Sequence, residues 1–115
     1  MLPISTLAHL EDSLAAGRAT SRDVVEKHLA AALDPSGEGK HVFTHIYDQS
    51  ARTSADQIDK QNRFGRSAES LLGLPISVKD LFDVAGESTP AGSIVLADAL
   101  PAIRDATVIR RLRAA

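Results

Sequence analysis

The sequence contains no cysteine and few aromatic residues. The absence of cysteine excludes disulfides, thiolate nucleophiles and cysteine-based zinc or iron–sulfur sites, and it favours a reducing compartment. With three Phe, one Tyr and no Trp, the core must be built mainly from aliphatic side chains. An excess of basic residues is also lacking: 13 basic and 15 acidic residues give a net charge of −2, which argues against a dedicated nucleic-acid binder.

Long apolar segments are absent as well. No stretch approaches the roughly 18 apolar residues that a membrane helix needs. Met1–Thr6 does not combine a basic region with an apolar run, so we expect no signal peptide. These features predict a cytoplasmic protein. With 115 residues, 43% of them hydrophobic, the chain suffices for one domain with a modest core.

The first part of the chain predicts a helical hairpin over about residues 5–33. Apolar residues recur there at spacings of three and four, which places them on one face of each helix. They are Leu7, Leu10 and Leu14 in the first helix, and Val25, Leu29, Ala32 and Leu33 in the second. Gly17 should end the first helix, and Thr20 or Ser21 should cap the second. Asp34–Lys40, rich in Pro, Gly and Ser, predicts an exposed loop.

The middle of the chain predicts a strand followed by a helix, over about residues 42–62. The strand, 42–47, is dense in β-branched and aromatic residues. Asp48 should cap the helix, which reaches about Asn62. Its apolar side is formed by Ala51, Ala55 and Ile58. The polar segment Arg63–Ser70 predicts a loop.

The remaining segments are a lysine-bearing strand and loop, about residues 73–93, and a terminal helix, about 105–115. In the strand, Ile76 and Val78 alternate with polar residues. Asp105 should cap the helix. Its apolar side carries Val108, Ile109, Leu112 and Ala115, and its polar side carries Arg110, Arg111 and Arg113. Two strands and four helices do not complete a sheet covered on both faces, so the architecture is incomplete.

Several polar groups have both a functional and an ordinary interpretation. His41 and His45 are four residues apart, but on a strand that spacing separates their rings by about 13 Å, which favours ordinary histidines over a metal pair. The arginines near the C-terminus could contact phosphate or form the solvated face of a helix. Asp80 and Asp83 could act as an acid–base pair, or could cap and solvate the chain. Lys79, at the end of an apolar strand, could be buried or could extend to solvent.

The segment Gly73–Gly86, GLPISVKDLFDVAG, closely resembles the lysine-bearing segment of the amidase signature family. Thr89–Ser93 is similar to that family's Thr-x-Ala-Gly-Ser loop, and Arg104–Ala115 resembles its next helix. Gly17–Leu29 is similar to its N-terminal helical hairpin. The resemblance covers nearly the whole chain. It implies an α/β fold: the N-terminal part of the amidase-signature fold, a mixed sheet covered by helices, incomplete here and forming one partial domain over residues 1–115.

The resemblance also implies a mechanism. In that family a neutral lysine takes a proton from a serine on a cis peptide, which relays it from the serine that attacks a carboxamide carbon. The matching residue here is Lys79. A free lysine, with a pKa of about 10.4, is neutral in roughly one molecule in a few thousand at pH 7, so the triad requires deep burial or a nearby cation. Both serines are expected downstream of the terminal helix, because Ser77, Ser88 and Ser93 do not occupy matching positions.

We therefore expect the N-terminal portion of a hydrolase that cleaves carboxamides to acid and ammonia or amine, with no cofactor or metal, and inactive as an isolated 115-residue chain. The expected partner is a small-molecule amide, with no nucleic acid directly and no membrane, and the full-length enzyme could form a homo-oligomer. One alternative is the first component of a glutamine-dependent, tRNA-dependent amidotransferase, although Asp80–Asp83 is more similar to the hydrolases. The other is a non-catalytic interaction module, because no element after Ala115 covers Val108 and Leu112.

Overall fold

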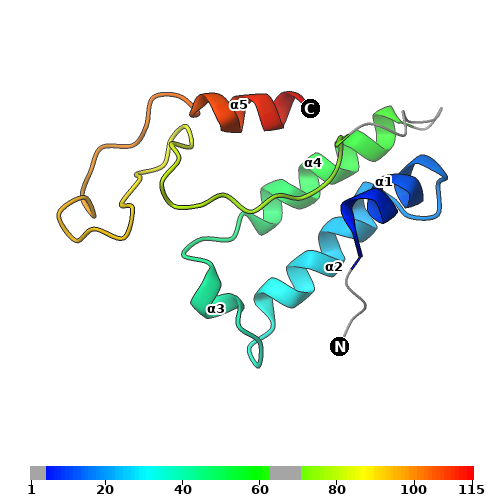
Figure 1. Cartoon of the computed structure of the whole chain (residues 1–115), viewed down its shortest axis with the longest axis horizontal. Coiled ribbons are helices and arrows are strands. Elements are labelled where there is room, and N and C mark those ends of the chain that lie inside the picture. The colour runs from blue at the N-terminus through cyan, green and yellow to red at the C-terminus, as the bar shows by residue number, and fades with distance from the viewer. Residues whose placement is uncertain (1–4, 63–70) are drawn as a thin grey trace. The chain divides into compact units, whose positions relative to one another are not determined.

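The structure, a computed structural model, describes residues 5–62 and 71–115 (Figure 1). These residues form five helices and no strand. The helices are α1 (Leu7–Ala15), α2 (Ser21–Leu33), α3 (Gly39–Val42), α4 (Asp48–Gln61) and α5 (Thr107–Ala114). The chain divides into two compact units, Met1–Pro75 with α1 to α4 and Ile76–Ala115 with α5. None of the described helices is long and apolar enough to span a membrane. The loop predicted over Arg63–Ser70 lies outside the described residues.

The predicted helical hairpin is confirmed, and its ends are set by local capping. The side chain of Thr6 accepts the N–H of His9 at the start of α1, and Gly17, with a φ of +67°, follows its end. Thr20 caps α2 in a reciprocal pair of hydrogen bonds with Asp23. The Thr20 hydroxyl accepts the N–H of Asp23 at 3.0 Å, and the Asp23 carboxylate accepts the N–H of Thr20 at 2.9 Å.

The core of the first unit lies between α2 and α4, which run side by side (Figure 1). Val25 and Leu29 on α2 pack with Ala55 on α4, and all three are buried. Ile46 and Ala51 pack against them and are partly buried. The predicted apolar faces of both helices thus meet, because burying the two stripes against one another removes both from water.

The strand predicted over 42–47 is wrong. Val42 ends the short helix α3, and residues 43–47 are irregular. Within the described residues no neighbouring strand offers these residues backbone partners, and a single strand cannot satisfy its own N–H and C=O groups. Val42, Phe43 and Tyr47 accordingly remain exposed. Asp48 is the first residue of α4 and the N-cap is Tyr47, one residue earlier than predicted.

The predicted loop Asp34–Lys40 is shorter than expected, because its last two residues begin α3. Gly39 is buried against the end of α2: a Cβ atom there would lie 1.8 Å from the carbonyl oxygen of Ala32. Only glycine fits this close approach of two backbones. The exposed part of the loop is therefore limited to residues 34–38, in which Gly37 is half-buried.

The strand predicted at residues 74–79 is also wrong, since these residues are irregular. Ile76 and Val78, expected to face a core together, are both exposed. A mixed sheet covered by helices is therefore not present in the described part of the chain, which is helical with long irregular segments. In each of these segments the sequence has β propensity, but propensity alone does not supply a pairing partner.

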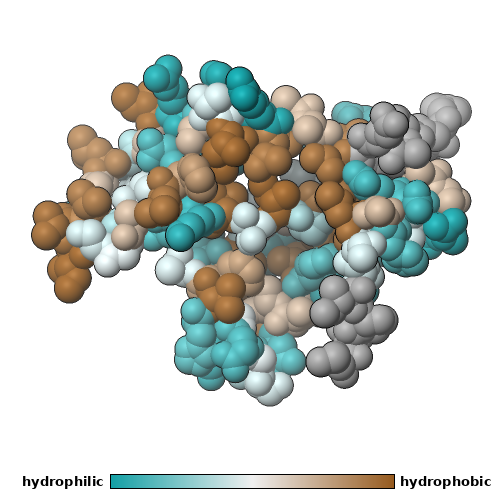
Figure 2. All heavy atoms as spheres, in the orientation of Figure 1, coloured by the Kyte–Doolittle hydropathy of each residue, from teal (hydrophilic) through white to brown (hydrophobic). Residues whose placement is uncertain are grey.

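The second unit has little core. On α5, Ile109 is buried, while Val108 and Leu112 are 42% and 39% exposed, so the predicted apolar side is only partly covered. Asp105 is not the N-cap of α5, which is Ala106. The loop before α5 carries hydrophobic side chains at the surface, gathered at the left of Figure 2. Ile94, Leu100 and Ile103 are at least 90% exposed.

Candidate functional site

Lys79 lies in the second unit, directly before a tight turn. Its carbonyl oxygen accepts the N–H groups of Leu81 at 2.7 Å and Phe82 at 3.2 Å. Its side chain is exposed, and within the described residues no hydrogen bond or ion pair holds it. Burial of the lysine at the end of an apolar strand is therefore not observed, because the strand itself is absent. The turn fixes the backbone at Lys79 and leaves the ammonium in water.

Asp83, four residues after Lys79, joins this turn to the loop that follows. Its carboxylate accepts the hydroxyl of Thr89 at 2.8 Å, and its carbonyl oxygen accepts the N–H of Ala106 at 2.8 Å. No hydrogen bond joins it to Asp80. The structure therefore supports the ordinary interpretation of Asp83, in which its carboxylate organises the chain, and does not bring the two acids together as an acid–base pair.

Asp105 makes a second connection, with its two carboxylate oxygens bonded to different partners. Oδ1 accepts the N–H of Ala85 at 2.8 Å, and Oδ2 lies 2.8 Å from Nε of Arg113 on α5. The Asp105 side chain is only 17% exposed. One carboxylate thus links the chain after Lys79 to the terminal helix. The sequence indicated a cap at this position, and nothing in the residue pattern identified Ala85 as its partner.

Backbone hydrogen bonds reinforce this connection a few residues further on. The N–H of Gly86 donates to the carbonyl of Ala102 at 2.8 Å, and the N–H of Ala102 donates to the carbonyl of Glu87 at 2.9 Å. The Ser88 hydroxyl donates to the carbonyl of Ala99 at 2.6 Å. The segment 83–88 is therefore attached at several points to residues 99–106, although no regular strand forms.

The loop over Thr89–Ser93 closes in a strained turn. Its two central residues, Ala91 and Gly92, have φ values of +51° and +71°. The N–H of Ser93 donates to the carbonyl of Pro90 at 2.8 Å, which completes a turn of the type I′ class. A positive φ is unfavourable for alanine. The conformation of this loop is thus imposed by its surroundings rather than chosen by Ala91.

A polar hollow of about 260 Å³ lies beside these connections in the second unit. It is lined by Asp83, Arg104, Asp105, Ala106, Thr107 and Arg110. Two carboxylates face the same space as the two arginines, so their charges oppose binding of a phosphate there. Arg113, a third member of the arginine-rich end, is paired with Asp105.

The histidines do not assemble a metal site. His41 lies on α3 and His45 follows that helix, with its ring 4.3 Å from the ring of Tyr47, centroid to centroid. Within the described residues, no three His, Asp or Glu side chains are grouped closely enough to hold a metal ion. The chemistry available to this part of the chain is therefore that of its lysine, carboxylates and hydroxyls.

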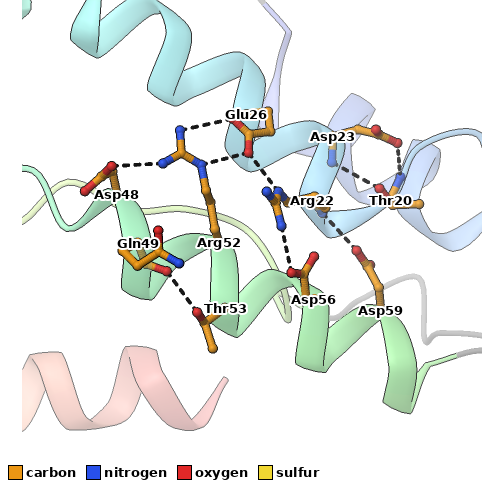
Figure 3. A network of polar contacts seen from close by, with 10 residues as sticks. All are labelled: Thr20, Arg22, Asp23, Glu26, Asp48, Gln49, Arg52, Thr53, Asp56 and Asp59. Carbon is orange, nitrogen blue, oxygen red and sulfur yellow. Dashed lines mark hydrogen bonds and ion pairs between the residues drawn. The ribbon is translucent and has the colours of Figure 1, made fainter.

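The largest polar network lies in the first unit, between α2 and α4 (Figure 3). The Glu26 carboxylate bonds to Nε of both Arg22 and Arg52, at 2.8 Å each. Arg22 also pairs with Asp56 at 2.7 Å, and Arg52 with Asp48 at 2.9 Å. Hydrogen bonds from Arg52 and Arg22 hold the pKa of Glu26 below its usual value, and the carboxylates in turn raise the pKa of both arginines. The network joins the two helices and faces no cavity.

The sequence model of the Amidase family matches residues 25–115, which include Lys79 and the connected loop. This chain belongs to the amidase family. Its match starts within α2 and runs through α5, so both units of the amidase chain contribute to it. The resemblance found in the segment Gly73–Gly86 is thereby confirmed.

Relatives of the chain include a hydrolase and an amidotransferase. The chain is 39% identical over 104 residues to AtzE of Pseudomonas sp. (strain ADP), which belongs to a 1-carboxybiuret hydrolase, and the alignment covers 90% of this chain and 22% of the relative. It is 34% identical over 110 residues to GatA-type component A of the glutamyl-tRNA(Gln) amidotransferase of Streptomyces coelicolor, covering 96% of this chain and 22% of that protein.

Solved structures give the same family. A chain from the "unexpected vestigial protein complex" reported to reveal the evolutionary origins of an s-triazine catabolic enzyme matches with a TM-score of 0.82 and 36% identity. That match covers 96% of this chain and 24% of the other. The inhibitor-bound form of the same complex matches with a TM-score of 0.83. The amidase chain thus spans between a fifth and a quarter of the length of the relatives it matches, which fits the N-terminal portion expected from the sequence.

Proposed function

We propose that Lys79 is the general base of a carboxamide hydrolase, in a Ser–cis-Ser–Lys triad whose serines lie outside these 115 residues. The neutral lysine accepts a proton from the serine on the cis peptide, which takes one from the nucleophilic serine as that serine attacks the carboxamide carbon. The amine leaves with a proton, and water hydrolyses the acyl-enzyme to release the acid. The observation that carries this proposal is the family match across Lys79 and the loop connected to it.

The exposure of Lys79 is consistent with a base that is completed by other parts of the protein. Ile76 and Val78, close before the lysine, are exposed as well. A surface that covered these apolar side chains would also remove the Lys79 ammonium from water, and desolvation favours the neutral form that the reaction needs. The proposed partner is a small-molecule amide, with no nucleic acid or membrane bound by this chain.

A second candidate is the corresponding component of a glutamine-dependent amidotransferase that acts on charged tRNA. The observation in its favour is the 34% identity to the Streptomyces coelicolor protein over nearly the whole chain. The segment Asp80–Asp83 favours the hydrolases, because the transamidases tend to carry Asn after the Lys-Asp pair. Both candidates release ammonia from a carboxamide, and they differ in whether that ammonia is transferred. Since the hydrolase relative is itself one component of a larger enzyme, assembly with other chains is proposed alongside a homo-oligomer.

The proposal is tested on the native polypeptide that carries this sequence, in the cells from which it comes. An antibody against the exposed residues 34–38 recovers the polypeptide, its size is measured, and ammonia release from simple amides and from glutamine is assayed. We expect a product much larger than 12.2 kDa that releases ammonia. Lys79→Ala and Lys79→Arg should abolish release, since arginine cannot become neutral near pH 7. Lys27→Arg, an exposed lysine on α2, is the matched control and should keep the rate.

Three results would count against the proposal. Full activity in Lys79→Arg would remove the lysine from the mechanism. A native product of 12.2 kDa without activity would favour the interaction module, for which the exposed apolar residues on α5 are the supporting feature. Recovery of the polypeptide in a complex that transfers ammonia to tRNA-bound glutamate would favour the amidotransferase.

A further inference from the structure

Three residues separate Lys79 from the first point at which its segment is attached to the rest of the second unit. The turn after Lys79 is closed by two hydrogen bonds to its own carbonyl, and the carbonyl of Asp83 then accepts the N–H of Ala106. The position of the lysine backbone relative to α5 therefore depends on this turn and on the bonds that follow it. A base must be held within a fraction of an ångström of its partner, so these bonds matter to a reaction at Lys79.

Among these bonds, those of Asp105 are the ones made by a side chain that comes from outside the loop and reaches both sides of the joint. Oδ1 accepts the N–H of Ala85, and Oδ2 is bonded to Arg113 two turns along α5. A carboxylate held at both oxygens has little rotational freedom, and its low exposure limits competition by water. Asp83 and Thr89 brace the loop from within, but they do not reach the side chains of the helix.

We propose that Asp105 is a positioning residue for the amidase reaction: by accepting the N–H of Ala85 while bonded to Arg113, it fixes the segment that carries Lys79 against α5. This inference rests on the proposed function of Lys79. Asp105 does not contact Lys79 and takes no part in proton transfer. It acts through the backbone between Asp83 and Ala85.

The test separates the geometry of Asp105 from its charge. Asp105→Asn keeps an oxygen in place for the N–H of Ala85 but loses the charge that pairs with Arg113. Asp105→Glu keeps the charge but displaces the carboxylate by one methylene. If position is what matters, Asn restores the reaction and Glu does not. Asp98→Asn is the matched control, because Asp98 lies exposed in the same unit and makes no hydrogen bond or ion pair among the described residues.

The variants are made in the full enzyme that carries this sequence, and kcat and KM for amide hydrolysis are measured separately. We expect Asp105→Ala and Asp105→Glu to lower kcat about 10- to 100-fold with KM changed less than about twofold, since a displacement near 1 Å costs up to about 100-fold. Asp105→Asn should stay within about threefold of the parent, and Asp98→Asn should be unchanged. A residue that only stabilised the fold would lower the melting temperature without this pattern in kcat.

The possible failures are distinguishable. If Lys79→Arg is inactive while Asp105→Ala and Asp105→Glu keep more than half of kcat, the positioning role is wrong and the function of Lys79 stands. If Lys79→Arg is fully active, both are wrong. Should Asp105→Ala fail to fold, the comparison of Asn with Glu decides: equal kcat values in those two variants overturn the proposal. Hydrogen exchange at the Ala85 amide, measured in the full enzyme, should quicken in Asp105→Glu and not in Asp105→Asn, and the absence of that difference would also overturn it.

Discussion

Replacing Asp59 with alanine should destabilise the first unit more than any other single change on the exposed side of α4. The Asp59 carboxylate caps a helix that is not its own: its two oxygens accept the N–H groups of Ser21 at 2.8 Å and Arg22 at 2.9 Å, the first two residues of α2 (Figure 3). With Thr20 and Asp23 bonded to each other, all four N–H groups that a helix start leaves without partners are satisfied. Ser21 is fully buried, so water cannot replace the lost acceptor there.

The size of the effect follows from these two bonds. A hydrogen bond to a charged group contributes about 1.5–3 kcal/mol when buried and less near the surface, so loss of these two part-buried bonds should cost about 2–3 kcal/mol. For a unit of this size that lowers the melting temperature by roughly 10–20 °C. Asp59→Asn retains one acceptor oxygen and should lose about half as much.

Thermal unfolding of the 115-residue chain, followed by circular dichroism at 222 nm, provides the assay, with hydrogen exchange at the amides of Ser21 and Arg22 to localise the change. Gln57→Ala, an exposed substitution on the same helix, is the control. If Asp59→Ala lowered the melting temperature no more than Gln57→Ala, or left both amides protected, the cap between helices would be refuted.

Three further changes test other parts of the first unit. Gly39→Ala would place a Cβ 1.8 Å from the carbonyl oxygen of Ala32 and should cost about 1–3 kcal/mol in urea unfolding, whereas Gly37→Ala, whose nearest contact is 3.3 Å, should cost less. Leu29→Ala empties the buried cluster and should cost about 2–5 kcal/mol in the same assay. The pKa of Glu26 is lowered in the folded state from a usual value of 4.5, so its contribution to stability is present above that pH and is lost as the pH falls through the folded value. The urea midpoint of the parent chain should therefore drop more steeply below about pH 4.5 than that of Glu26→Gln, and parallel curves would contradict the role of the network.

The helices of the first unit were predictable because their signals are local. Thr20 and Gly17 mark ends through bonds and dihedral angles within a few residues, and the spacing of Val25 and Leu29 indicates a buried face wherever that face is directed. The cap supplied by Asp59 could not be predicted in the same way. It comes from 37 and 38 residues away, and a carboxylate on a polar helix face gives no sign of which N–H groups it will meet.

The two predicted strands failed for the opposite reason. Residues 42–47 and 74–79 have the composition and alternation of strands, yet a strand exists only when a neighbour pairs with its backbone. The described part of the chain provides no such neighbour, and the first of these segments begins inside a short helix instead. β propensity indicates how a segment suits a sheet, and the sheet itself is a property of segments far apart in sequence.

The candidate site divides in the same way. Lys79 was identified from its sequence motif, and the family match includes it. The motif could not show that Asp83 and Asp105 attach its segment to α5, because the bonds of Asp105 reach 20 residues back and 8 residues forward along the chain. Sequence reasoning gave Asp105 a nearer partner, the N-terminus of α5, and that cap is not formed.

Lys79, Ile76 and Val78 share one explanation for being exposed. The motif suits a lysine held without charge, and the alternation of Ile76 and Val78 suits a buried face, but both environments must be made by atoms outside the segment. The bonds that the segment makes for itself, the turn after Lys79 and the links through Asp105, fix where the backbone lies and leave the side chain solvated. If the proposal for Lys79 holds, position and protonation state are therefore supplied separately: the first by this chain, and the second by the surface that closes over it.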